Sequence, residues 1–156
     1  MTEPVLKVFL KDGAKMPVYG RPGDSGLDLR ATETVMLDLL TPTKVMTGVH
    51  VEIPEGFEGQ VRPRSGLSSE GVTVALGTID RNFRGEIGVT MTLVRVDFAE
   101  FLKDGSGPLR REIKAGDKIA QLVIAPVATV RTAQVQSLTE LSETARGEHG
   151  WGSSGR

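Results

Sequence analysis

The run Ile119-Ala-Gln-Leu-Val-Ile-Ala125 is apolar at every position except Gln121. A short, nearly continuous apolar run is typical of a strand buried on both faces, so we expect it to pass through the centre of the fold. Earlier in the chain, apolar and polar residues alternate at 49–53 and 87–93, which predicts strands with one buried face. The chain is therefore organised around short strands.

Turn signals and the scarcity of helix narrow the fold class. Gly- and Pro-containing turns recur between the predicted strands, which include two further runs rich in strand formers at 5–10 and 34–39. Only 67–71 and 138–144 could hold one or two helical turns. Many short strands at this spacing predict a β-sandwich, a jelly roll or a barrel.

Composition excludes several classes of function. With 156 residues and a net charge of −1, the chain has the size of one domain and lacks the strong positive charge that a nucleic-acid polymer attracts. It contains no run of about 20 apolar residues and no signal-peptide pattern, so we expect no membrane partner and a cytoplasmic location. The absence of cysteine excludes disulfides, thiolate nucleophiles and zinc–sulfur sites, and with only two histidines we expect no histidine-based metal centre.

Two segments depart from the regular strand pattern. Residues 97–114 form a charged excursion that is longer than the loop of about two to five residues in an ordinary hairpin. We interpret it as an elaborated loop, with a short helical turn at 98–103, within one domain that spans 1–145. The last residues, 146–156, are rich in glycine, and taken alone they could be either a frayed end or a mobile lid.

Polar residues gather in two earlier segments. Asp28 lies between two leucines in a predicted strand, and on its own it could be an exposed aspartate. Arg64, Ser65 and Gly66 offer a guanidinium, a hydroxyl and an unobstructed N–H in consecutive positions. At the start of a helical turn these donors would form an anion site, although an N-cap serine explains the same residues.

Residues 77–86 predict a hairpin that leads into the strand at 87–93, with Asp80 close to its tip and Phe83 across from it. Backbone N–H and C=O groups at a strand edge can read the edge of a base. An aspartate in a turn is also a common structural feature, however. Gln121 is open to two interpretations in the same way, as a satisfied core amide or as a binding group.

Taken together, these segments resemble the motifs of the trimeric, all-β dUTP pyrophosphatases (dUTPases). The five matching stretches are Ser-Gly-Leu-Asp-Leu-Arg-Ala at 25–31, Pro-Arg-Ser-Gly-Leu at 63–67, Gly-Thr-Ile-Asp at 77–80 with Gly85, Gly-Asp-Lys-Ile-Ala-Gln-Leu at 116–122, and Arg-Gly-Glu-His-Gly-Trp-Gly-Ser-Ser-Gly at 146–155. They occur in the family's order and span most of the chain. The resemblance implies an all-β fold, a distorted jelly roll or β-sandwich of short, mostly antiparallel strands with little helix and a flexible C-terminal arm.

The resemblance also implies the reaction. Hydrolysis of dUTP would give dUMP and pyrophosphate, which limits uracil incorporation into DNA and supplies dUMP for dTMP synthesis. Asp80 would activate the water that attacks the α-phosphate. Mg²⁺ would be held by the substrate phosphates and water rather than by direct protein ligands. Asp28 would act through water or by orienting an arginine of the lid.

The other site residues are implied in the same way. They are Arg64, Ser65, Gly66 and Gln121 for the phosphates; Gly77, Thr78, Ile79 and Gly88 for uracil; Phe83 for the deoxyribose; and Arg146, Trp151, Gly152 and Ser153 in a lid at 146–156. In the family each site is shared among three subunits. We therefore expect dUTP as the ligand and a homotrimer with shared sites.

Three positions depart from the family pattern. Phe83 stands where tyrosine is usual, Trp151 where phenylalanine is usual and Lys118 where arginine is common. The two aromatic exchanges keep a stacking surface, and the exchange at Lys118 is expected to matter little. One alternative is a dCTP deaminase on the same fold, although the chain lacks the arginine- and glutamate-bearing stretch that those relatives carry in place of 63–67. Another is a regulatory protein that binds a partner through 97–114.

Overall fold

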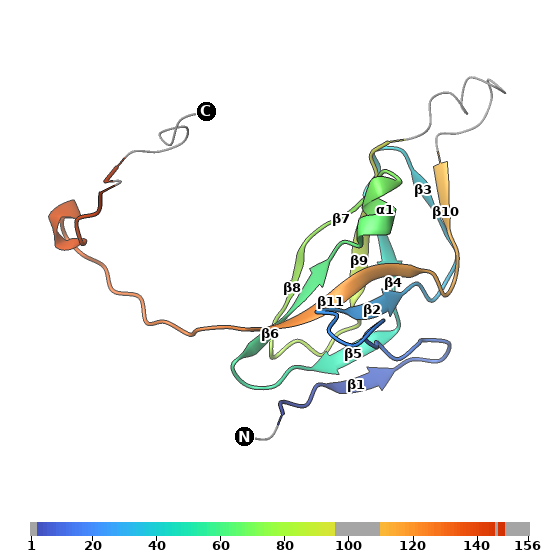
Figure 1. Ribbon diagram of the computed structural model, residues 1–156, viewed down its shortest axis with the longest axis horizontal. Helices are drawn as coiled ribbons and strands as arrows, with labels where there is room; N and C mark the ends of the chain where they lie inside the picture. Colours follow the sequence, from blue (N-terminus) through green and yellow to red (C-terminus); the bar gives the residue numbers. More distant parts are fainter. Residues whose placement is uncertain (1–2, 96–109, 146, 149–156) are drawn as a thin grey trace.

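The structure is a computed structural model and describes residues 3–95, 110–145 and 147–148 (Figure 1). Within these residues the chain forms eleven strands, one α-helix and one 3₁₀ helix. In chain order they are β1 (Lys7–Leu10), β2 (Leu27–Arg30), β3 (Val35–Asp38), β4 (Thr43–Met46), β5 (Val49–Glu52), β6 (Phe57–Arg62), α1 (Ser65–Ser69), β7 (Val72–Val74), β8 (Gly77–Ile79), β9 (Gly88–Leu93), β10 (Arg110–Ile113), β11 (Lys118–Pro126) and η1 (Leu138–Glu140).

The strands pair antiparallel and form four small sheets in the described part of the chain. A four-stranded sheet has the order β2-β11-β6-β8, and a three-stranded sheet has the order β4-β9-β7. Strand β1 pairs with β5, and β10 pairs with β3. Helix α1 has only five residues. The prediction of an all-β fold of short antiparallel strands with little helix is confirmed.

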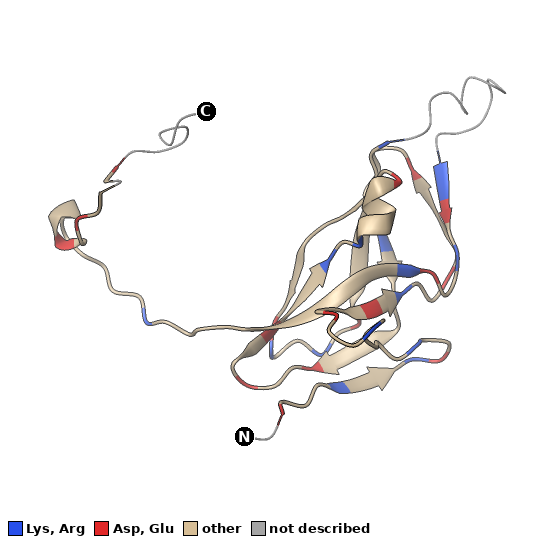
Figure 2. Ribbon diagram, viewed as in Figure 1, with Lys and Arg blue, Asp and Glu red and all other residues tan. Residues whose placement is uncertain are grey.

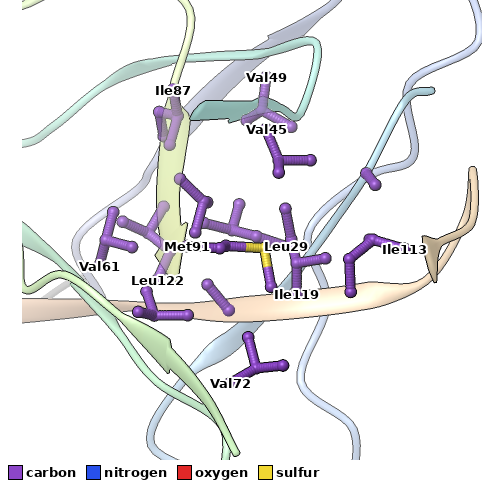
Figure 3. Packing of buried hydrophobic residues seen from close by; sticks show 14 of the residues in the cluster. Leu29, Val45, Val49, Val61, Val72, Ile87, Met91, Ile113, Ile119 and Leu122 are labelled. Atoms are coloured by element: carbon purple, nitrogen blue, oxygen red, sulfur yellow. The ribbon is translucent and has the colours of Figure 1, made fainter. Parts of the chain in front are cut away.

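Strand β11 lies between β2 and β6, as its apolar sequence predicts. Its side chains Ile119 and Leu122 are fully buried and belong to the same core cluster as Leu29 and Met91 (Figure 3). From Val123 to the end of the apolar run the strand is only half-buried. The first half of β11 is therefore the central element, and it places its own polar residues close to the core.

Strand β10 lies inside the segment 97–114 that the sequence predicts as a loop. Its residues pair with β3, and Ile113 is only 1 % exposed. Burial of this apolar side chain holds the end of the segment in a strand, so the predicted loop ends before Arg110. The helical turn predicted at 98–103 lies outside the described residues.

Residues 127–145 leave the body of the protein as an extended arm (Figure 1). Every side chain along it is exposed, including Val130 at 77 % and Leu138 at 62 %. The helix predicted at 138–144 is confined to the single turn η1, which is stabilised by a local capping box rather than by packing. Exposed apolar side chains on an extended segment are typical of a surface that packs against a partner. The single domain expected over 1–145 stays a prediction.

Charged residues are interspersed over the body, with basic and acidic positions side by side (Figure 2). This distribution agrees with the net charge of −1. Across residues 3–95, 110–145 and 147–148, no helix combines the length and the apolar character needed to cross a membrane.

Glu86, in the segment between β8 and β9, binds two groups earlier in the chain, Lys11 and Gly48. Its carboxylate accepts hydrogen bonds from Nζ of Lys11 at 2.6 Å and from the backbone N–H of Gly48 at 2.8 Å. The hydrogen bond from Lys11 is the main cause that holds the pKa of Glu86 below its ordinary value of 4.5, although burial acts in the opposite direction. The folded protein therefore binds this proton more weakly than the unfolded chain does. The interaction stabilises the fold above pH 4.5, and this contribution is lost as the pH falls below that value.

We expect Glu86→Gln to lower the free energy of unfolding by about 1 kcal/mol at neutral pH, because the amide keeps the shape but loses the charge. Urea unfolding of both proteins at neutral pH and at about pH 3.5 should show the difference shrinking as the carboxylate is protonated. The matched control is Glu55→Gln, whose side chain is 90 % exposed and should contribute less than about 0.5 kcal/mol. An equal Glu86→Gln effect at both pH values would contradict this account.

Candidate active site

Asp28 is a buried carboxylate in β2, with 6 % of its surface exposed. The interpretation as an exposed strand aspartate is therefore wrong. The guanidinium of Arg64 donates to Oδ1, and Nζ of Lys118 lies 2.6 Å from Oδ2. A buried carboxylate is unfavourable unless charges and hydrogen bonds compensate it. The two cations therefore fix β2, β11 and the segment before α1 relative to one another.

Arg64 is the N-cap residue of α1. Its side chain makes no capping hydrogen bond to the helix and instead contacts Asp28. Ser65 and Gly66 form the first turn of the helix, and both are exposed. The interpretation of Ser65 as the N-cap is therefore wrong. Because the first N–H groups of a helix have no partner inside it, this turn can receive an anion.

Gln121 lies opposite Asp28 on one side of β11 and opposite Arg62 on the other. Its half-buried side chain lies against Gly26, where an added Cβ would come within 2.8 Å of Oε1 of Gln121. Glycine at this position leaves the space that the amide occupies. The structure therefore brings together Asp28, Arg64 and Gln121, which come from three separate predicted segments.

The segment predicted as a hairpin instead crosses between two sheets. Strand β8 (Gly77–Ile79) is the edge strand of the four-stranded sheet, whereas β9, which begins at Gly88, belongs to the three-stranded sheet. The hairpin prediction is wrong because Glu86 and the fully buried Ile87 hold the chain away from β8 and beside the start of β5, where the N–H of Ile87 donates to the C=O of Val49 at 2.8 Å. Strand β8 pairs with β6 along one edge, so its other edge can present backbone groups to a ligand.

Asp80 and Phe83 lie in the turn that follows β8. The backbone N–H of Phe83 donates to the C=O of Asp80 at 3.0 Å, and the Asp80 side chain is exposed. The ring of Phe83, 39 % exposed, lies over Gly85, where an added Cβ would come within 2.5 Å of the ring. Gly85 therefore allows the ring to lie against the backbone beside Asp80.

Asp80 and Arg64 lie at opposite ends of the β6–β8 pair. Ile79 is opposite Gly59, so Asp80 follows at one end, while β6 continues past its pairing with β8 towards Arg64 at the other. At about 3.3 Å per residue, the two residues are roughly 15–20 Å apart along the strands. One chain therefore does not bring the predicted base and the predicted phosphate-binding residues together.

Four of the predicted site residues cannot be placed, and two contacts were not predicted from the sequence. Arg146, Trp151, Gly152 and Ser153 lie outside the described residues. Sequence reasoning missed the contact of Lys118 with Asp28, because residues 118 and 121 would face opposite sides of a regular strand. The anchoring role of Glu86 was also missed, since its partners are remote in the sequence.

The contacts of Asp28 indicate how the expected magnesium ion would be held. Both carboxylate oxygens of Asp28 already contact cations, so neither is free to be a direct ligand. Among the described residues, no cluster of three or more His, Cys, Asp or Glu side chains could hold a metal ion. Mg²⁺ commonly keeps several waters and binds through substrate phosphates. The residues present therefore fit an ion held mainly by phosphates and water.

Known relatives share both the sequence and the fold of this chain. The deoxyuridine 5'-triphosphate nucleotidohydrolase of Clostridium tetani is 39% identical over 160 residues, covering 100% of both chains. The protein of the same name from Rhizobium rhizogenes is 43% identical over 150 residues, covering 92% of this chain and 86% of its own. The dUTPase of Staphylococcus bacteriophage 80alpha, solved with dUPNHPP, is 31% identical with a TM-score of 0.84, covering 97% of this chain and 99% of the phage chain.

A second solved structure adds a metal to the comparison. A mutant dUTPase from phage phi11 of S. aureus, which coordinates a structural Mg(II) ion, is 30% identical with a TM-score of 0.73, covering 86% of this chain and 98% of its own. The sequence profile described as dUTPase matches residues 12–98 and 109–155 of this chain. This chain therefore belongs to the dUTPase family.

Proposed function

We propose that this chain hydrolyses dUTP to dUMP and pyrophosphate with the residues described above. As a member of the dUTPase family, it is a nucleotide pyrophosphohydrolase. The observation that carries the proposal is the contact of Arg64 with Asp28 at the start of α1, beside Gln121. It gathers donors suited to a polyphosphate beside the exposed first turn of α1.

The phosphates would bind at the first turn of α1. Arg64 offers a planar guanidinium, Ser65 a hydroxyl and Gly66 a backbone N–H, all of which donate well to phosphate oxygens. Gln121 would add an amide donor from β11. Because Arg64 contacts Asp28 in this structure, we expect it to exchange the carboxylate for a phosphate oxygen when the triphosphate binds.

Asp80 would activate the attacking water. Mg²⁺, when bound, would neutralise part of the negative charge of the triphosphate. The exposed carboxylate of Asp80 would orient a water in line with the α-phosphorus and accept its proton. Its position next to Phe83 supports this role, since the ring and the carboxylate would then face the sugar and the α-phosphate of one nucleotide.

Base and sugar selection would come from β8 and the turn after it. The backbone groups of Gly77–Ile79 present hydrogen-bond donors and acceptors in fixed positions. Cytosine has an exocyclic amine, a donor, at the position where uracil has a carbonyl acceptor, so it would not match them. A close approach of the backbone would leave little space for the methyl group of thymine. The ring of Phe83 keeps the flat surface of the usual tyrosine, so a ribose 2′-hydroxyl would clash with it.

We infer that the sites are completed in a homotrimer. The roughly 15–20 Å between Asp80 and Arg64 in one chain is too far for both to act on one nucleotide, so another copy would supply one of them. The arm 127–145, with its exposed apolar side chains, supports exchange of a segment with a neighbouring copy. A lid at 146–156, carrying Arg146 and Trp151, would then cover a neighbour's site. The protein partner expected through 97–114 and the cytoplasmic location stay predictions.

Asp80→Asn tests the proposed reaction. The amide cannot accept the proton of water, so we expect turnover of dUTP to fall by about 10²–10⁴-fold. Binding of dUTP in the presence of Mg²⁺ should persist, because the phosphate and uracil contacts remain. Pyrophosphate release and calorimetric titration measure the two properties separately.

The matched control for Asp80 is Asp12→Asn, which changes another exposed aspartate in a turn. It should leave turnover at the level of the unmodified protein. Normal turnover in Asp80→Asn would exclude Asp80 as the base.

Deletion of residues 146–156 tests the lid. We expect kcat/KM for dUTP to fall by about a hundredfold, since the closed site would lose its clamp on the nucleotide. The melting temperature and the oligomeric state should not change, because the deleted residues begin after the arm. Full activity of the truncated protein would refute the lid.

A further inference from the structure

A β-bulge in β11 determines which face Lys118 occupies. Lys118 is opposite Arg30, whereas Gln121 is opposite Asp28, so β11 uses one more residue than β2 over this stretch. The register shift lies between Lys118 and Ala120. Without it, positions 118 and 121 would lie on opposite faces of the sheet. The bulge therefore places Lys118 and Gln121 on the same face as Asp28, and bulges commonly redirect a side chain in this way.

Lys118 and Arg64 occupy different oxygens of the same buried carboxylate. Nζ of Lys118 lies 2.6 Å from Oδ2 of Asp28, and Nη1 of Arg64 contacts Oδ1. The side chain of Asp28 is 6 % exposed, that of Arg64 is 27 % exposed and that of Lys118 is 35 % exposed. Because the two cations do not share an oxygen, one of them can leave while the other stays in place.

We propose that Lys118 is a positioning residue for the reaction, which holds Asp28 when Arg64 exchanges this carboxylate for a phosphate of the substrate. The inference rests on the proposed function, in which Arg64 binds a phosphate. If Arg64 left and nothing replaced it, Asp28 would remain as an unpaired buried charge, which is strongly unfavourable. Lys118 prevents this and so lowers the free energy that Arg64 needs to reach the phosphate. It acts through Asp28 and does not contact the substrate.

The test compares two substitutions at Lys118 in the full-length chain. Lys118→Met keeps the length but removes the charge, whereas Lys118→Arg keeps the charge. Calorimetric titration with the imido analogue dUpNHpp and Mg²⁺ should show binding about tenfold weaker for Lys118→Met, as expected for loss of a charge-assisted contact. Lys118→Arg should bind like the unmodified protein.

A control removes a nearby lysine that does not contact Asp28. The side chain of Lys114 is 72 % exposed, and its Nζ lies 3.8 Å from Oε2 of Glu112. Because Lys114 contacts Glu112 rather than Asp28, Lys114→Met should leave binding unchanged. Thermal unfolding of each variant separates weak binding from loss of the fold. Unchanged binding in Lys118→Met, or equal weakening in Lys118→Arg, would overturn the proposal.

Asp28→Asn distinguishes a positioning role from direct contact with phosphate. Without the carboxylate charge, Arg64 is no longer held back, so Lys118→Met should add little further loss of affinity in the Asp28→Asn background. The same loss in both backgrounds would mean that Lys118 binds the phosphates itself, and would overturn its positioning role. If Asp28→Asn does not fold, Lys118→Met in the unmodified background still tests the proposal, because unchanged binding there would overturn it.

The outcome also separates this inference from the proposed function. An unmodified chain that neither binds dUpNHpp nor hydrolyses dUTP would contradict the proposed function itself. An unmodified chain that does both, while Lys118→Met binds the analogue equally well, would overturn only the role assigned to Lys118.

Discussion

A buried carboxylate that cannot remain unpaired links the separate parts of this protein's site. Asp28 is 6 % exposed in β2, and its two oxygens contact Arg64 before α1 and Lys118 in β11. Because an unpaired charge at this depth would be strongly unfavourable, the three segments hold one another in register. Gln121 and the first turn of α1 take their places from this arrangement. In the proposed reaction, a phosphate of the substrate would replace Asp28 as the partner of Arg64.

The crossing of the chain from β8 to β9 sets the second part of the site. Glu86 and the buried Ile87 hold the chain beside Lys11 and the start of β5, which leaves Asp80 and Phe83 on an exposed turn between β8 and β9. This turn lies at the far end of the β6–β8 pair from Arg64. The proposed homotrimer would explain both the separation of Asp80 from Arg64 in one chain and the exposed apolar arm at 127–145.

Much of the fold follows from local patterns in the sequence, but the pairing of remote segments does not. The apolar run that contains Gln121 predicts the central strand correctly, because burial on both faces requires apolar residues on both. The turn residues of segment 77–86 predict a hairpin. The structure differs because Glu86 binds Lys11 and Gly48, which are remote in the sequence. Likewise, the buried Ile113 and pairing with β3 hold β10 in a segment whose charge predicts a loop.

In the site too, groups that are adjacent in the sequence can be recognised, whereas contacts between remote residues cannot. Arg64, Ser65 and Gly66 are recognisable because their donors are adjacent in the sequence. The contact of Lys118 with Asp28 cannot be recognised in the sequence, since it depends on a bulge that reverses the expected face of one residue. Bulges shift the register without a distinctive composition, so the strand pattern alone gives no sign of them.

In the proposed function, these residues form a site that hydrolyses dUTP and selects both the base and the sugar. The most direct measurement follows pyrophosphate and ammonia release from dUTP, dCTP, dTTP and UTP, each supplied separately with Mg²⁺. The account predicts pyrophosphate from dUTP, far less from the other three nucleotides, and no ammonia from dCTP. Ammonia release from dCTP, or equal hydrolysis of dUTP and UTP, would contradict it.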